Sequence, residues 1–163
     1  MLLIGEEIRF IETYLELQKH QFGERLKYKL DIEDSCVDYY IPKMTLVTFV
    51  ENACVHGVEK KAVTTWIYVR VYKKNNIIYL EIEDTGAGME EPEVEMLRER
   101  MLTSNIESLR QNTHIGIANA CLRLRMVTKE NVEFELDSEP GIGTLILIKI
   151  PEENLRMYGE KSE

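Results

Sequence analysis

One segment of the sequence places polar side chains where they can share a helix face. Thr48, Asn52 and His56 follow one another at intervals of four residues, and Glu51 lies beside Asn52. Residues four apart in an α-helix point to the same side, so this spacing predicts a polar stripe. Asn is unfavourable inside a helix because its amide competes for backbone hydrogen bonds, so Asn52 needs solvent or a specific partner. A solvated face gives the same pattern, but an amide oxygen is also a suitable ligand for Mg²⁺.

A second feature is the stretch from Asp84 to Met89, which reads Asp-Thr-Gly-Ala-Gly-Met and follows an apolar strand pattern. A carboxylate at the end of a buried strand can accept a hydrogen bond from a ligand donor. Gly86 and Gly88 let the backbone approach a ligand closely because they carry no Cβ. An ordinary turn has the same composition, so this stretch alone is a weak signal.

Two further segments combine glycine with the start of an element. His114 to Asn119 contains Gly116 and opens a predicted helix, where free backbone N–H groups suit a phosphate. Gly141 to Thr144 precedes the last predicted strand. Neither segment is a Walker loop or a Rossmann fingerprint, because Gly-Lys-Ser/Thr and the strand, Gly-x-Gly-x-x-Gly, helix succession are missing. The motifs therefore exclude both of those nucleotide-binding folds.

The elements that must position these residues follow from hydrophobic periodicity. Helical spacing predicts helices over 6–22, 42–58 and 116–127, and alternation predicts strands over 26–32, 36–41, 66–72, 77–84, 132–137 and 144–150. The long segment between Gly86 and Ile115 shows only a weak helical pattern. This order predicts an α+β fold, a two-layer α/β sandwich with a mixed, mostly antiparallel sheet under helices. Glu133, Glu135 and Asp137 mark the solvated face of that sheet.

Composition bounds the class of protein. The 163 residues are 44% hydrophobic and 30% charged, which is typical of one soluble globular domain. A formal charge of -9 gives a nucleic-acid backbone no general attraction, so we expect no nucleic-acid partner. We see no signal peptide or membrane-spanning stretch and expect no direct membrane contact. Cys36, Cys54 and Cys121 lack paired spacing and are expected to be reduced core thiols in a cytosolic compartment.

Together, in this order and spacing, the four segments resemble the N, G1, G2 and G3 boxes of the Bergerat ATP-binding fold. That fold is shared by gyrase, the MutL repair protein, heat-shock chaperones and sensor histidine kinases. The resemblance is most detailed for LytS/YesM-type sensor histidine kinases, whose N box reads Glu-Asn-Ala-x-x-His-Gly, as residues 51–57 do here. Residues 14–19 and 22–26 also resemble the segment that joins the phosphoacceptor region to the catalytic domain in that group. The resemblance covers about Gly5 to Pro151.

This resemblance implies a role for each motif. Asn52 would hold the Mg²⁺ that bridges the ATP phosphates, and Asp84 would accept a hydrogen bond from the adenine amino group. Backbone amides near Gly116 would reach the phosphates, Thr144 would reach adenine through water, and residues 90–114 would form an ATP lid. The implied catalytic residues are Glu51 and Asn52, the implied metal ligand is Asn52, and the implied ATP-binding residues are Asn52, His56, Asp84, Gly86, Gly88, Met89, Ile115, Gly116, Ile117, Asn119, Gly143 and Thr144.

The sequence also departs from the family pattern. Val55 stands where many histidine kinases carry Lys or Arg, so Lys60, Lys61 or Arg110 is a candidate substitute at the phosphates. His114 replaces the first glycine often found in the G2 box, and we interpret it as a surface histidine rather than a lid hinge. Thr48 stands where ATP-hydrolysing relatives place Glu, which argues against water activation by that route. Glu51 either activates the acceptor histidine or forms a structural salt bridge.

The resemblance implies a division of the chain and a function. Residues 1–25 would be the end of the phosphoacceptor and dimerisation helix with its connector, 26–152 the ATP-binding catalytic domain, and 153–163 a polar tail. The chain would transfer the ATP γ-phosphoryl group to an upstream histidine for relay to a response regulator, since His20 does not match the acceptor context. We expect a cytoplasmic, monomeric domain of a membrane-anchored kinase. The alternatives are a nucleotide-binding pseudokinase, a gyrase- or chaperone-like ATPase, and a domain without nucleotide binding.

Overall fold

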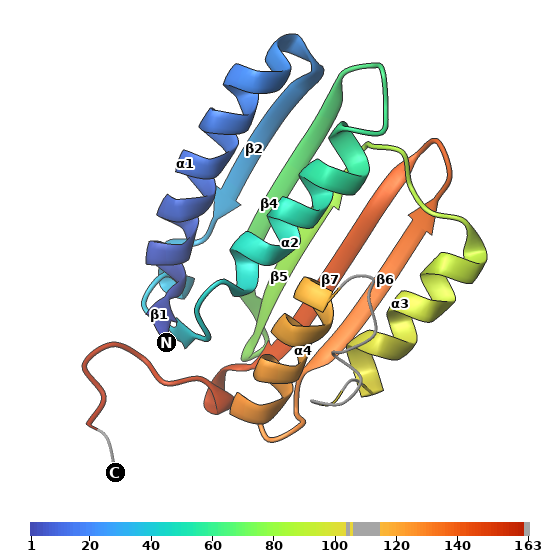
Figure 1. The fold of residues 1–163 in the computed structure, drawn as a ribbon. Helices are drawn as coiled ribbons and strands as arrows, with labels where there is room; N and C mark the ends of the chain where they lie inside the picture. The colour runs from blue at the N-terminus through green and yellow to red at the C-terminus, as the bar shows by residue number, and fades with distance from the viewer. Residues whose placement is uncertain (104, 106–114, 162–163) are drawn as a thin grey trace.

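A computed structural model describes residues 1–103, 105 and 115–161 as one layer of helices on one sheet (Figure 1). The helices are α1 (Ile4–Phe22), α2 (Thr45–Ala53), α3 (Glu91–Thr103) and α4 (Ile115–Val127). The main sheet contains β2 (Leu26–Ile32), β4 (Thr65–Lys74), β5 (Ile77–Asp84), β6 (Glu133–Glu139) and β7 (Gly143–Pro151). The short strands β1 (Leu2–Leu3) and β3 (Tyr40–Ile41) pair with each other.

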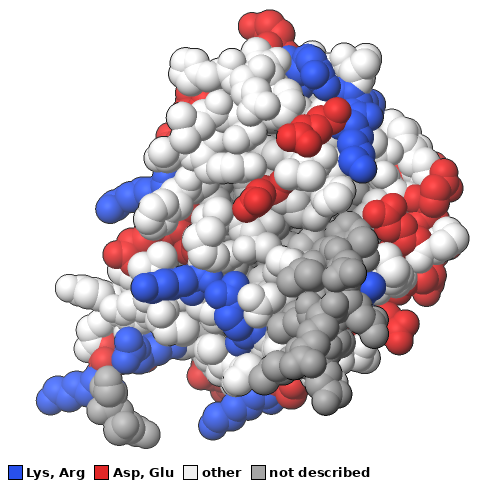
Figure 2. Space-filling view, in the orientation of Figure 1, with Lys and Arg blue, Asp and Glu red and all other residues white. Residues whose placement is uncertain are grey.

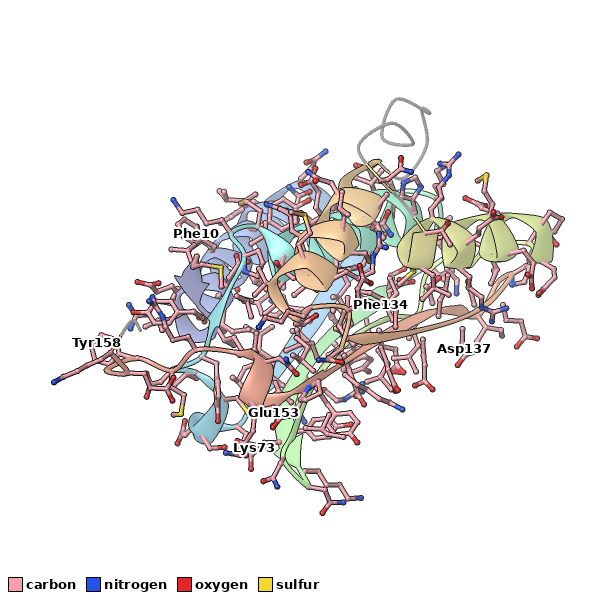
Figure 3. All side chains as sticks on the ribbon, turned by 90° about the horizontal axis from the view of Figure 1, so that it is seen from below. Phe10, Lys73, Phe134, Asp137, Glu153 and Tyr158 are labelled. Atoms are coloured by element: carbon pink, nitrogen blue, oxygen red, sulfur yellow. The ribbon has the colours of Figure 1, made fainter. Side chains whose placement is uncertain are left out.

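The order of strands across the main sheet is β2-β4-β5-β7-β6. β2 runs parallel to β4, and the other three neighbouring pairs are antiparallel. The predicted two-layer α/β sandwich with a mixed, mostly antiparallel sheet is therefore confirmed. Seen at right angles to Figure 1, the helices lie on one side of the sheet and leave the other side open (Figure 3).

Alternation along the strands produces these two faces, because successive side chains of a strand point to opposite sides. In β4, Ile67, Val69 and Val71 are buried in the core. In β6, Phe134 packs against the core from between the two layers, whereas Asp137 lies exposed on the open side (Figure 3). The predicted solvated face is confirmed.

The helix that carries the polar stripe differs from its prediction at both ends. It begins at Thr45 and not at Pro42, because Met44 adopts a left-handed backbone with φ 65° that cannot continue a helix. Beyond Ala53 the chain widens into a π-helix over Cys54–Val58. Such turns often occur at functional sites.

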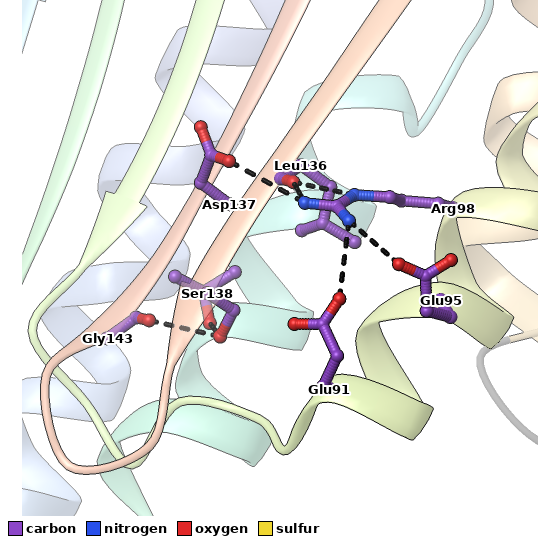
Figure 4. Close-up of polar contacts among 8 residues, drawn as sticks. Glu91, Glu95, Arg98, Leu136, Asp137, Ser138 and Gly143 are labelled. Carbon is purple, nitrogen blue, oxygen red and sulfur yellow. Dashed lines mark hydrogen bonds and ion pairs between the residues drawn. The ribbon is translucent and has the colours of Figure 1, made fainter.

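The segment between β5 and α4 also corrects the sequence-based expectation. The long segment between Gly86 and Ile115, where the sequence shows only a weak helical pattern, contains the helix α3, which packs with Val94, Leu97 and Met101 buried. Arg98 fixes this helix to the sheet edge: its Nε and one terminal nitrogen donate to the Leu136 carbonyl at 3.0 and 2.7 Å (Figure 4). The rest of the expected lid, including Arg110 and His114, lies outside the described residues.

The three cysteines are core thiols, as the sequence predicts. Cys36, Cys54 and Cys121 are buried and form no disulfide. Burial raises the pKa of the Cys54 thiol to about 12, so this thiol stays protonated at neutral pH. No helix within the described residues is both long and apolar enough to cross a bilayer.

Candidate functional site

The polar stripe of α2 lines a hollow on the helical side of the molecule. The hollow has a volume of about 330 Å³ and is lined by Thr48, Glu51, Asn52, Val55, His56, Gly116 and Ile117. Glu51 is exposed, and Asn52 and His56 are half-buried, so all three are within reach of a ligand in this hollow. The structure therefore brings together the predicted residues of the 51–57 and 114–119 motifs, although they are far apart in sequence.

The first turn of α4 borders this hollow through Gly116. A Cβ at Gly116 would lie 3.2 Å from Cγ2 of Thr48, so glycine lets α4 begin close against α2. The first backbone N–H groups of a helix lack intrahelical partners and can bind an anion. Ile117 is buried behind this turn, whereas the Asn119 side chain is exposed and is not part of the lining. Ile115 begins the helix, as expected for the predicted motif.

Asp84 lies at the end of β5 with its carboxyl group directed toward the helical layer. It is 7% exposed, and its Oδ1 accepts a hydrogen bond from the Gly86 N–H at 2.8 Å. Burial raises the pKa of Asp84 to about 6, and the Gly86 N–H and the Lys61 ammonium counteract part of this shift. At neutral pH the group is a buried carboxylate with acceptor capacity left for a ligand.

Close backbone contacts around Asp84 explain the glycines of both loops. A Cβ at Gly86 would lie 2.3 Å from the Gly57 Cα, and one at Gly143 would lie 2.0 Å from the Asp84 carbonyl oxygen. Gly88 has φ +67°, and a Cβ there would lie 2.0 Å from the Glu139 carbonyl oxygen. Only glycine fits such approaches without moving the backbone.

These contacts join two segments at one end of the sheet (Figure 1). We call this region the loop junction: residues 85–90 after β5 and residues 139–143 around the β6–β7 turn. The Gly141 N–H donates to the Ala87 carbonyl at 2.7 Å, and the Met89 N–H donates to the Ser138 hydroxyl at 2.9 Å. Met89 is buried, and Ser138 also hydrogen-bonds Thr144 at 2.8 Å. Met89, Gly143 and Thr144 thus lie around the same end of β5 as Asp84.

The π-helix links the loop junction to the hollow. His56 lines the hollow, and its neighbour Gly57 packs against Asp84, where a Cβ would lie 2.9 Å from Oδ1. Two adjacent residues therefore reach two different parts of the site. Sequence spacing alone predicts one regular helix over residues 42–58 and does not reveal that its last turn is a π-helix.

Sequence reasoning missed Ser138 and named Lys61 for a different part of the site. Ser138 has no distinguishing spacing in the sequence, yet it hydrogen-bonds the Gly143 carbonyl, Thr144 and Met89. Lys61 is a sequence-based candidate for a basic residue at the phosphates, but its ammonium lies at the loop junction, 2.9 Å from the Thr85 carbonyl oxygen. Nothing in a Lys60-Lys61 pair separates such a residue from ordinary surface charge.

Charge on the helical face is mixed. Figure 2 shows basic and acidic side chains interspersed among uncharged ones on this face. Among the described residues, no cluster of three or more His, Cys, Asp or Glu side chains is arranged to hold a metal ion. In the lining of the hollow, the Asn52 amide oxygen can ligate a metal ion, and the backbone N–H groups at the start of α4 can bind an anion.

Residues 42–154 match the family described as histidine kinase-, DNA gyrase B-, and HSP90-like ATPases. The chain belongs to this ATPase family. The match spans the polar stripe, Asp84 and both glycine loops, and it supports ATP as the ligand of the site.

Named relatives of this ATPase domain are sensor proteins. The sensor protein LytS of Bacillus anthracis is 28% identical over 148 residues, which are 91% of this chain and 24% of that protein. The sensor histidine kinase YesM of Bacillus subtilis is 31% identical over 148 residues, 91% of this chain and 23% of that protein. The chain thus spans about a quarter of the length of these curated relatives.

Solved structures show the same fold. A catalytic domain of the histidine kinase ThkA has a TM-score of 0.63 at 13% identity and covers 94% of this chain and 96% of that domain. The histidine kinase domain of a blue-light activated kinase from Erythrobacter litoralis has a TM-score of 0.61 at 18% identity, covering 93% of this chain and 62% of that one. The expected ATP-binding fold is confirmed by these likenesses.

Proposed function

We propose that this chain is the ATP-binding catalytic domain of a LytS/YesM-type sensor histidine kinase. In the full-length protein it transfers the ATP γ-phosphoryl group to a histidine of the dimerisation region, from which a response regulator receives it. The observation that carries this proposal is the pairing, through adjacent His56 and Gly57, of a polar hollow beside Asn52 with the buried carboxylate of Asp84. Relatives named as sensor kinases match across 91% of the chain.

Adenine recognition rests on the loop junction. The Asp84 carboxylate accepts a hydrogen bond from the adenine amino group, a charge-assisted contact that a buried site strengthens. Gly86 and Gly88 let the backbone approach the base, with Met89 as an apolar contact beside it. Thr144 acts at the same edge through a bridging water.

Phosphate and magnesium recognition rests on the hollow. The Asn52 amide oxygen would hold Mg²⁺ together with phosphate oxygens of ATP and water, the ligands that Mg²⁺ usually keeps in phosphate sites. Mg²⁺ neutralises phosphate charge when it is bound. The free N–H groups of the first turn of α4, around Gly116 and Ile117, face the phosphates, so this chain acts by positioning and electrostatics.

Two residues separate phosphoryl transfer from hydrolysis. The Thr48 hydroxyl donates to the Met44 carbonyl within its own helix, so it is neither an acid nor a base for an attacking water. Glu51 is exposed at the rim of the hollow, where it is accessible to a histidine of the dimerisation region. We assign to Glu51 the orientation or deprotonation of that acceptor. This favours kinase over gyrase-like ATPase chemistry.

The proposal extends to the whole protein. The dimerisation region and the response regulator are partners of the full-length kinase, and a membrane anchor belongs to segments other than the one described here. The nucleotide site then lies on the cytoplasmic side, where ATP is supplied.

The test is phosphotransfer in the full-length protein with γ-labelled ATP and Mg²⁺. We expect an acid-labile, alkali-stable phosphohistidine that Asn52→Ala and Glu51→Gln strongly reduce. Nucleotide binding without label transfer would show a pseudokinase instead. Steady phosphate release without a labelled protein would show an ATPase of the gyrase or chaperone kind.

A further inference from the structure

Lys61 places a cation among backbone carbonyl groups of the loop junction. Its Nζ donates to the Thr85 carbonyl at 2.9 Å, to the Gly141 carbonyl at 3.0 Å and to the Gly86 carbonyl at 3.4 Å. The three acceptors belong to two loops that are far apart in sequence. An ammonium has three donors, and here each is directed to a different carbonyl group.

The backbone of Lys61 is itself held in place. A terminal nitrogen of Arg25 donates to the Lys61 carbonyl at 2.7 Å and to the Val58 carbonyl at 3.1 Å. The segment that follows the π-helix is thus fixed from one side by Arg25, while its Lys61 side chain reaches the loops on the other. A half-buried lysine anchored in this way loses less conformational freedom when it forms its contacts.

We propose that Lys61 is a positioning residue, an internal cation that clamps the loop after β5 to the β6–β7 turn and so presets the adenine end of the site. The inference rests on the proposed function in one respect: the base bound beside Asp84 is adenine. Gly86 links the two roles, because its carbonyl faces Lys61 and its N–H donates to Asp84. Removing the ammonium frees three carbonyls and loosens the loop that carries this N–H.

If Lys61 contacted the phosphates directly, its removal would affect the affinities for ADP and for an ATP analogue differently. A lysine that binds phosphates contributes more to a triphosphate than to a diphosphate, because its partner carries more charge. A clamp at the base end contributes equally to both nucleotides. The ratio of the two affinity losses therefore separates the two roles.

The experiment compares Lys61→Met with Lys74→Met, the same change at an exposed lysine at the end of β4. We expect Lys61→Met to weaken the binding of ADP and of a non-hydrolysable ATP analogue equally, by about tenfold, and Lys74→Met to leave both affinities unchanged. Amide exchange in residues 85–88 and 139–143 of the nucleotide-free protein should rise only in Lys61→Met. Unchanged affinity with unchanged exchange, or a larger loss for the triphosphate, would overturn the proposal.

A second readout follows from charge. Burial and the charge of Glu83 raise the pKa of the Asp84 carboxyl group, whereas the Gly86 N–H, the charge of Lys61 and the Thr144 backbone lower it. The buried Cys54 thiol interacts with the same carboxyl group. Nucleotide affinity should fall to half at a higher pH in Lys61→Met than in the wild type. In Lys61→Arg, which keeps the charge, this midpoint should return to the wild-type value. If the wild type binds no nucleotide, the proposed function fails, but the exchange comparison still tests the clamp.

Discussion

The two ends of the proposed nucleotide site are built in different ways. At the adenine end, Asp84 is 7% exposed, and the surrounding backbone is fixed by glycine contacts, by the Gly141 to Ala87 hydrogen bond and by Lys61. At the phosphate end, the described groups are side chains on one face of α2, with Glu51 exposed and Asn52 half-buried. The adenine end is therefore ordered before a ligand binds, whereas the side chains of the phosphate end are accessible and become ordered on binding.

This difference predicts how binding energy is divided. A preorganised pocket loses little conformational freedom on binding, so its hydrogen bonds contribute fully to affinity. Side chains that must be ordered contribute less, and a metal ion shares the phosphate charge with them. We therefore expect the largest losses of affinity from changes at the adenine end.

Asp84→Asn is expected to have the largest effect. An amide is a weaker acceptor than a carboxylate, so affinity for ADP should fall about a hundredfold. The same change should raise the free energy of unfolding at neutral pH. The folded-state pKa of about 6 exceeds the reference value of 3.8, so ionisation of the buried carboxyl group destabilises the fold as pH rises through that interval. Calorimetric titration and thermal unfolding measure the two effects, and a parallel loss of both would contradict the account.

Gly88→Ala should break the loop junction, with Gly141→Ala as its matched control. Both glycines have positive φ, but a Cβ at Gly88 would lie 2.0 Å from the Glu139 carbonyl oxygen, whereas nothing lies within 4 Å of one at Gly141. We expect a loss of about 3 kcal/mol in unfolding free energy and about thirtyfold in affinity for Gly88→Ala. Gly141→Ala should lose about 1 kcal/mol and little affinity. Equal losses in urea unfolding would show that backbone strain alone matters.

Asn52→Ala tests the phosphate end. We expect affinity for a non-hydrolysable ATP analogue to fall about tenfold with Mg²⁺ present and to be nearly unchanged when the metal is chelated. Binding measured at both conditions gives this ratio directly. An equal loss in the absence of the metal would assign Asn52 a role that does not involve Mg²⁺.

Val55→Lys is expected to have the smallest effect and the opposite sign. Val55 is half-buried in the lining of the hollow, where an ammonium would gain a phosphate partner. Affinity for the ATP analogue should rise about threefold, and the gain should shrink at high salt because the contact is solvent-exposed. A gain that is equal for AMP would place the new charge away from the terminal phosphates.

Much of this architecture can be predicted from the sequence, because the spacing of hydrophobic residues indicates which face of a helix or strand is buried. The alternation of Ile67, Val69 and Val71 is enough to predict both a strand and its buried side. It does not predict the partner of a strand, and the parallel pairing of β2 with β4 comes from the tertiary structure. α3 gives only a weak periodic signal because only Val94, Leu97 and Met101 are buried, and many of its other positions are charged.

The candidate site divides in the same way. The order and spacing of the motifs resemble the boxes of one ATP-binding fold, and this resemblance predicts that Asn52, Asp84 and Gly116 belong to one site. The clamping role of Lys61 could not be found in this way, because its acceptor at Gly141 is 80 residues away and a backbone carbonyl leaves no trace in residue type. The same holds for the turn at His56 and Gly57, where a π-helix sends neighbours to different ends of the site.

The most direct test of the account is calorimetric titration of the nucleotide-free protein with ADP and Mg²⁺ near pH 6, repeated in buffers that differ in ionisation enthalpy. Asp84 has a pKa of about 6 in the free protein, and the adenine amine favours its ionised form. Binding should therefore release a fraction of a proton near this pH, affinity should rise as pH increases through it, and Asp84→Asn should abolish the release. Absence of saturable heat, or a proton release that Asp84→Asn leaves unchanged, would contradict the assignment of Asp84 to the adenine end of an ATP site.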